Sequence, residues 1–303
     1  HMAMGAWLRL VASDFIGTRR AIEAAVRADP GDARAVANLA LLLDESLGRA
    51  ADALPHFERA RALDPRSVII WRSYARALAS VGRVDEARAA ADRARALAPA
   101  NDAAAAVRLE IELAVGDTAA ARALLPTMLR ELPPGRAAFA LATVGGWLLP
   151  DEAATRLLAV GADAFDGDRG QWALQRAMLL VQRGDSASAR PVADTALRLL
   201  ADEAARPTAS STVLRDVATA EAIAGRRAAA RATVLRAAAR LQDESGAARG
   251  SAWASELYPI ACAAALAGAT DSAAAWLTAI RTVPSVQTTA RMRVDPCVTG
   301  AVR

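Results

Sequence analysis

Residues 67–100 read SVIIWRSYARALASVGRVDEARAAADRARALAPA, and no other part of the chain shows its organisation as clearly. Three large apolar residues, Trp71, Tyr74 and Leu78, are three and four positions apart, which places them on one face of a helix. Gly82 follows, and glycine ends helices because it adopts the left-handed conformation without a steric penalty. Small alanines then recur at helical spacing up to a proline. The stretch predicts two helices packed as a hairpin.

The hairpin pattern recurs along the chain with a fixed period. Pro65, Pro99 and Pro133 follow one another at intervals of 34 residues. Upstream, residues 36–60 carry the same two apolar stripes, with one extra residue in the turn between them. Self-similarity at a fixed period indicates a repeat protein, in which each unit packs only on its neighbours.

This pattern resembles the tetratricopeptide (TPR) repeat, whose period is about 34 residues. The residues that carry the resemblance in the clearest unit are Trp71, Tyr74, Ala75, Leu78, Gly82, Ala87, Ala91, Ala94 and Pro99. The resemblance implies an all-α fold, a right-handed α-solenoid of about eight TPR-like helical hairpins. It divides the chain into regular repeats at 3–133, degenerate repeats at 134–283 that continue the same solenoid, and a non-repeat C-terminal tail at 284–303.

Local signals mark the ends of several helices. Gly116-Asp117 and Gly184-Asp185 each combine a glycine that ends one helix with an aspartate that caps the next. Asp85 is expected to cap the second helix of the clearest hairpin in the same way. Pro126 and Pro191 fall inside predicted second helices, and we expect them to kink or shorten these helices.

The composition favours helices and argues against several kinds of partner. Hydrophobic residues make up 54% of the chain and aromatic residues only 4%, so alanine, the best helix former, dominates. The net charge is +4, but every basic residue is an arginine and the arginines are interleaved with acidic residues. The longest apolar stretch, residues 137–150, is too short to span a bilayer. We therefore expect no nucleic-acid partner and no membrane insertion.

Groups that catalyse reactions are scarce in this sequence. His1 and Met2 look like a cloning remnant, and His56 is the only other histidine, which excludes multi-histidine metal sites. Glycine-rich phosphate-binding loops are absent from the sequence. Carboxylate pairs such as Asp44-Glu45 are expected at helix ends, where they cap the helix and compensate its dipole. We predict that the chain is not an enzyme and has no catalytic, cofactor-binding or metal-binding residues and no cofactors.

The sequence contains two cysteines, Cys262 and Cys297. Two thiols so far apart do not form a recognisable disulfide framework or zinc motif. Cys262 lies in an apolar helical run and is expected to be a small core residue, and Cys297 lies in the tail and is expected to be exposed.

The resemblance implies that the first helices line a concave face that binds a peptide or a partner helix. The candidate peptide-binding residues on this face are Arg34, Asn38, Arg72, Arg76 and Glu110. The clamp that some TPR proteins use for chaperone tails needs lysine, and this chain has none. One hypothesis is that the arginines form a basic patch for an acidic or phosphorylated segment, because arginine binds both groups through two hydrogen bonds. The alternative is that these arginines are solvated and bridge neighbouring helices.

A second resemblance concerns residues 290–296, ARMRVDP. They resemble the endings of TPR regions in bacterial multidomain regulators that carry a Ser/Thr kinase or cyclase domain. The main prediction is a non-catalytic protein–protein interaction scaffold in the cytoplasm. The alternative is a ligand- or peptide-sensing regulatory module of a larger signalling protein, lying in the extracytoplasmic part of a membrane-anchored regulator.

Overall fold

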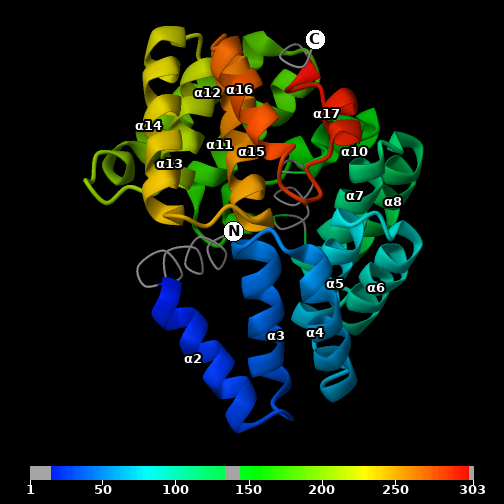
Figure 1. Cartoon of the computed structure of the whole chain (residues 1–303). Helices are drawn as coiled ribbons and strands as arrows, with labels where there is room; N and C mark the ends of the chain where they lie inside the picture. Colours follow the sequence, from blue (N-terminus) through cyan, green and yellow to red (C-terminus); the bar gives the residue numbers. More distant parts are fainter. Residues whose placement is uncertain (1–14, 134, 136–143, 300–303) are drawn as a thin grey trace. The chain divides into compact units, whose positions relative to one another are not determined.

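The computed structural model describes residues 15–133, 135 and 144–299. This part of the chain consists of helices and connections and contains no strand. Helices that follow one another in the sequence pack side by side, for example α5 with α6 and α11 with α12 (Figure 1). The predicted all-α fold of stacked helical hairpins is therefore confirmed. The N-terminal boundary predicted at Ala3 lies outside the described residues.

The regular repeats supply seven of the described α-helices. They are α2 (Phe15–Ala28), α3 (Ala33–Leu41), α4 (Ala50–Leu63), α5 (Val68–Ser80), α6 (Val84–Leu97), α7 (Asp102–Val115) and α8 (Thr118–Glu131). The following region has two short 3-10 helices and one short α-helix, namely η2 (Gly146–Leu148), α10 (Asp151–Leu158) and η3 (Ala162–Phe165). The remaining helices are α11 (Arg169–Gln182), α12 (Ser186–Ala204), α13 (Ser211–Ile223), α14 (Arg227–Ser245), α15 (Ser251–Leu266), α16 (Thr270–Ile280) and α17 (Thr289–Val294).

The predicted hairpin at 67–100 is the pair α5 and α6. Gly82 lies between the two helices with a φ of 82°, in the left-handed region that glycine adopts without strain. On α5, Tyr74 and Leu78 are buried, and the alanine stripe of α6 has no exposed surface. Small side chains at these crossings let the two helix axes approach closely, which is the packing that the sequence pattern predicts.

Two of the predicted helix caps are confirmed. Asp117 accepts a hydrogen bond from the backbone N–H of Ala120 at 2.8 Å, and Asp185 accepts one from Ser188 at 3.0 Å. The expectation for Asp85 was wrong. Asp85 lies in the first turn of α6 and forms an ion pair with Arg88 at 3.1 Å. The residue at the cap position is Arg83, and its side chain forms no hydrogen bond with the start of the helix.

Pro126 and Pro191 were expected to kink or shorten the second helices, and they do not shorten them. α8 continues through Pro126, and α12 continues through Pro191 to a length of 19 residues. The inner stripe of α12, which includes Ala189, Ala193 and Ala196, is fully buried. A proline removes one hydrogen bond from a helix, and the packing of this stripe on both sides of Pro191 outweighs that loss.

The extra residue in the upstream repeat produces a π-helical turn, η1 (Leu42–Ser46), at the end of α3. The backbone N–H of Leu47 donates to the carbonyl of Leu42 at 3.1 Å, the wider hydrogen-bond step of a π-helix. An inserted residue turns the following side chains by about 100° around the helix axis. Asp44 is consequently only 2% exposed. Asp44 and Glu45 thus lie at the end of the first helix, as predicted, and the burial of Asp44 was not foreseen.

Contacts divide the chain into two compact units, and neither unit is continuous in sequence. Unit 1 is formed by residues up to Val115 together with 241–257 and 278–291. Unit 2 is formed by residues 116–240, 258–277 and from Met292 onward. The boundaries predicted at 133 and 283 follow the regularity of the repeats, not these contacts, and stay a prediction.

The two cysteines form a disulfide in unit 2, between Cys262 on α15 and Cys297 in the tail. The expectation that they are separate was wrong, because distance along the sequence does not report distance in space. After α16 the chain returns to α15, where the Tyr258 hydroxyl donates to Asp295 at 2.9 Å. No helix within the described ranges has both the length and the apolar character needed to cross a membrane.

Candidate protein-interaction site

The inner stripe of α5 consists of Arg72, Arg76 and Ser80, which are four residues apart and therefore lie on one face of the helix. The other faces of α5 are buried in the hydrophobic core, through Tyr74 and Leu78 among others. All three stripe residues are partly exposed. The core packing of α5 thus fixes the direction in which the two arginines project.

Arg76 forms an ion pair with Glu110 on α7. Its Nε donates to one carboxylate oxygen at 2.8 Å and its Nη2 donates to the other at 3.1 Å. The two side chains are 21% and 15% exposed. The positive charge of Arg76 is therefore largely used inside unit 1, because a two-point pair with a half-buried carboxylate is a strong interaction.

Arg72 lies one turn before Arg76 and has no such carboxylate pair. Its Nε is buried and has no hydrogen-bond partner among the described residues. Burial lowers the pKa of Arg72, as does the charge of Arg76, whereas the charges of Glu45, Glu110 and Asp102 act in the opposite direction. The surroundings of Arg72 therefore include three carboxylates beside the two guanidinium groups and are not simply basic.

The other two predicted site residues lie on α3. Arg34 is exposed and Asn38 is half-buried. The described contacts link Arg76 to Glu110, and they include no side-chain contact from Arg34 or Asn38 to these residues. The structure thus pairs predicted residues of α5 and α7, and no described side-chain contact links Arg34 or Asn38 to that pair.

Other arginines of unit 1 bridge helices in the core. Glu112 on α7 has no exposed surface and accepts hydrogen bonds from Arg88 on α6 at 3.0 and 2.7 Å. Arg108 also forms an ion pair with Glu112. This arrangement matches the structural alternative for the arginines, because a buried carboxylate needs paired charges around it.

The chain's own helix α15 covers part of the α5 stripe. A cavity of about 10 Å³, the space of roughly one water molecule, separates the two helices. It is lined by Glu45, Arg76, Ser80, Ser251, Ala252, Ser255 and Val286. The first turns of α15 therefore lie against the end of α3 and the C-terminal half of α5, within unit 1.

Backbone contacts hold the start of α15 on the π-helical turn. The N–H of Arg249 donates to the carbonyl of Ser46 at 3.0 Å. A Cβ atom on Gly250 would lie 2.4 Å from the Glu45 carbonyl carbon and oxygen, a distance that real Cβ atoms do not show. Only glycine fits at position 250 without displacing the turn. Sequence analysis missed this contact, although the small residues at 250–255 at helical spacing are a signal of close packing.

Asp44 is the buried acid at the centre of this contact. One of its oxygens accepts a hydrogen bond from the Ser251 hydroxyl at 3.1 Å, and the other has no partner among the described residues. Burial, and to a smaller extent the charge of Glu45, raise the pKa of Asp44 to about 7, against the Ser251 hydrogen bond and the charge of Arg76. Burial also raises the pKa of Glu45. We therefore expect the contact between α15 and the turn to depend on the protonation of Asp44.

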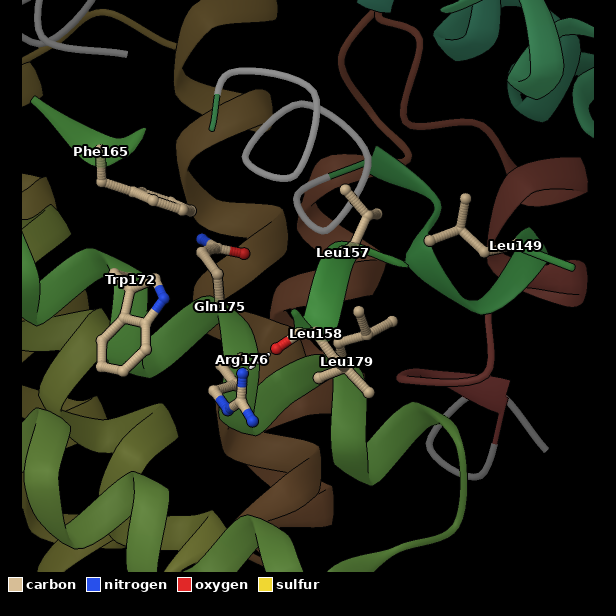
Figure 2. A pocket seen from close by; sticks show the side chains of 8 residues that line it. All are labelled: Leu149, Leu157, Leu158, Phe165, Trp172, Gln175, Arg176 and Leu179. Carbon is tan, nitrogen blue, oxygen red and sulfur yellow. Dashed lines mark hydrogen bonds between the residues drawn. The ribbon is translucent and has the colours of Figure 1, made fainter. Parts of the chain in front are cut away.

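Unit 2 contains an apolar cavity of about 20 Å³, again close to the space of one water molecule (Figure 2). Its lining residues are Leu149, Leu157, Leu158, Phe165, Trp172, Gln175, Arg176 and Leu179. Gln175 is 8% exposed, and its Oε1 accepts no hydrogen bond from a described residue. Figure 2 shows its amide directed toward Phe165 and the guanidinium of Arg176 directed the other way. A buried, unpartnered amide oxygen is a point where a donor would bind.

Neither cavity includes His56, the one histidine in the part of the chain that the structure describes. It lies on α4, where burial and the charge of Arg59 lower its pKa. The two cavities combine small volumes with arginine, glutamine and serine side chains. Such sites are suited to binding and packing contacts.

The stacked hairpins, with the polar stripe of α5, define a helical-repeat protein whose first helices carry polar residues. Residues 45–111, which include the α5–α6 hairpin, match the family model of the tetratricopeptide repeat. The predicted resemblance to a TPR protein is confirmed for this segment of the chain. Such repeats generally serve protein binding and not catalysis.

Among solved structures, the chain is similar to a tetratricopeptide repeat protein from Parabacteroides merdae ATCC 43184. The two chains are 13% identical, the likeness covers 93% of each, and the TM-score is 0.40. A search of curated proteins finds no match.

Proposed function

We propose that this chain is a non-catalytic scaffold whose first helices in unit 1 bind an acidic or phosphorylated segment of a partner protein. The observation that carries the proposal is that Arg72 has no carboxylate pair among the described residues. Its Nε is buried without a hydrogen-bond partner, whereas the neighbouring Arg76 is already paired with Glu110. Because the side chain of Arg72 is partly exposed, its terminal nitrogens, and not the buried Nε, would bind a ligand carboxylate or phosphate through two charge-assisted hydrogen bonds.

The packing of α15 on α5 supports the scaffold proposal, because a helix of the same chain already lies against this face of α5. α15 places Ser251, Ala252 and Ser255, three small residues on one side of the helix, against the C-terminal half of α5. The residues of α5 nearer its N-terminus, including Arg72, do not line that cavity. The partner segment is therefore proposed to lie over Arg72, with exposed Arg34 on α3 as a second contact.

The test is the affinity for acidic peptides, measured by fluorescence anisotropy with a glutamate-rich peptide and its phosphoserine counterpart. Arg72→Ala is expected to weaken binding at least about tenfold, because a hydrogen bond to a charged group contributes about 1.5–3 kcal/mol. Arg93→Ala, at an exposed position of α6, is the matched control and is expected to bind like the parent chain. Equal affinities for all three proteins would rule out the Arg72 site.

Attachment to a kinase or cyclase domain remains a proposal and rests on the resemblance of residues 290–296. In that arrangement, binding of a segment or ligand by the repeats would control the attached domain. A chain extended to its natural neighbours, assayed for kinase or cyclase activity with and without the acidic peptide, tests this proposal. Activity that does not respond to the peptide would argue against a regulatory role.

A further inference from the structure

We propose that the Cys262–Cys297 disulfide locks the tail onto α15 as the cap of the last hairpin in unit 2. We also infer that the chain acquires this bond in an oxidising compartment. The proposal concerns a part of the molecule that is independent of the Arg72 site. It is based on the character of α15, on the contacts of the tail and on the pairing of the two cysteines.

The half of α15 that belongs to unit 2 needs cover on more than one side. Four residues of this half point to different sides of the helix, and each is at most 3% exposed: Tyr258, Ile260, Ala261 and Ala263. An amphipathic surface helix buries one stripe, whereas a helix that is apolar all round must be covered all round. The end of a repeat array has no further repeat to provide that cover, so a capping element is required.

The tail has the contacts of such a cap. Met292 and Val298 have no exposed surface, although the tail is not part of a repeat. Between them, Asp295 accepts a hydrogen bond from the Tyr258 hydroxyl of α15 at 2.9 Å and one from the backbone N–H of Cys297 at 3.1 Å. Apolar burial and a buried hydrogen bond thus place the tail next to the cysteine of α15.

The disulfide makes this placement covalent. The chain has only two cysteines, 35 residues apart and on different elements, and their Cα atoms are 5.3 Å apart. This separation lies within the range of protein disulfides. The bond forms when two thiols exchange with the disulfide of an oxidant, which leaves as two thiols with the two hydrogens. Such bonds persist in oxidising compartments and are rare where thiols are kept reduced.

The same groups offer one competing chemistry. The ligand atoms of Cys262, Asp295 and Cys297 all lie within 4.8 Å of one another. Two thiolates and a carboxylate would suit Zn²⁺ if the cysteines stayed reduced. The disulfide and the metal site exclude each other, so one experiment distinguishes them.

The experiment uses the full chain secreted into the bacterial periplasm and purified without reductant. Its thiols are alkylated under denaturing conditions, and the mass is measured before and after treatment with dithiothreitol. We expect no alkylated cysteine before reduction and two after it. Two alkylated cysteines before reduction would overturn the proposal, and so would one zinc ion per chain released by a chelator.

The capping role is tested by trypsin, which cuts after arginine. Arg291, at the start of the cap, is 5% exposed. We expect cleavage after Arg291 to be at least about tenfold faster in the reduced chain, because the disulfide restricts the opening of the segment that it holds. Cleavage after Arg169, which is exposed and lies outside the tail, is the internal control and should not change.

A variant without cysteines completes the test. Cys262→Ser/Cys297→Ser is expected to be cut after Arg291 at the fast rate with and without reductant. If this variant is cut as slowly as the oxidised parent chain, the disulfide does not hold the cap. Circular dichroism on the same samples reports whether the variant keeps its helices, so unfolding is distinguished from release of the tail.

Discussion

Arg76 and Glu110 occupy the same position in two successive repeats, 34 residues apart, and bind each other through hydrogen bonds of 2.8 and 3.1 Å. The repeat register therefore pairs opposite charges along the first helices. This pair removes Arg76 from the predicted basic patch and leaves Arg72 as the guanidinium group without a carboxylate pair. The proposed binding site is accordingly centred on Arg72.

The first prediction concerns the strength of this pair. Both side chains are less than a third exposed, so solvent weakens their attraction only partly. In a double-mutant cycle with Arg76→Ala and Glu110→Ala, we expect a coupling energy of about 1–2 kcal/mol in the free energy of unfolding by urea. Effects that add to within about 0.3 kcal/mol would mean that the pair is not formed in solution.

The second prediction concerns the fit of Gly250 against the π-helical turn. Gly250→Ala places a Cβ 2.4 Å from the Glu45 carbonyl group, and both neighbours are backbone. We expect a loss of about 1–3 kcal/mol in the free energy of unfolding. Gly161→Ala is the control, because nothing lies within 4 Å of its Cβ and its φ is −76°. A similar effect of both substitutions would contradict the contact between α15 and the turn.

The third prediction concerns pH. Burial raises the pKa of Asp44 from 3.8 to about 7, so between these values the folded chain binds more protons than the unfolded chain. The free energy of unfolding therefore decreases as the pH rises through this window and levels off above it. The decrease is at most about 4 kcal/mol, since one pKa unit corresponds to about 1.36 kcal/mol.

Asp44→Asn isolates this contribution, because asparagine keeps an acceptor for Ser251 and carries no charge. The difference in stability between the variant and the parent chain should increase from pH 4.5 to pH 8 in urea unfolding experiments. Glu45, whose pKa is also raised, remains in both proteins and cancels in this comparison. A difference that does not change with pH would show that Asp44 does not titrate in this window.

The fourth prediction compares the contributions of two aspartates to stability: Asp117, which caps a helix, and Asp85, which lies exposed in the first turn of one. Asp117 accepts a backbone hydrogen bond at the start of α8, and Asp117→Ala should cost about 1 kcal/mol in the free energy of unfolding. The side chain of Asp85 is 95% exposed, and Asp85→Ala should change stability by less than about 0.5 kcal/mol. The reverse order in thermal or urea unfolding would contradict the assignment of the two caps.

The sequence by itself determined the helices, the repeat and most helix ends. The spacing of Trp71, Tyr74 and Leu78 specifies a helix face, and Gly82 specifies where that helix ends, because these signals act within one or two turns of the chain. The 34-residue interval made the packing of successive hairpins predictable. The pair of Arg76 and Glu110 also obeys this interval, although their bond was not foreseen.

Only the tertiary structure decided which distant residues meet. Ser251 bonds Asp44 across 207 residues, and Cys297 bonds Cys262 across α16, and no local pattern reports either approach. Such contacts depend on small rotations between repeats that accumulate along the chain, and a single repeat does not encode their sum. The burial of Asp44 and the state of Arg72 follow from these contacts, so the character of the candidate site became visible only in the folded chain.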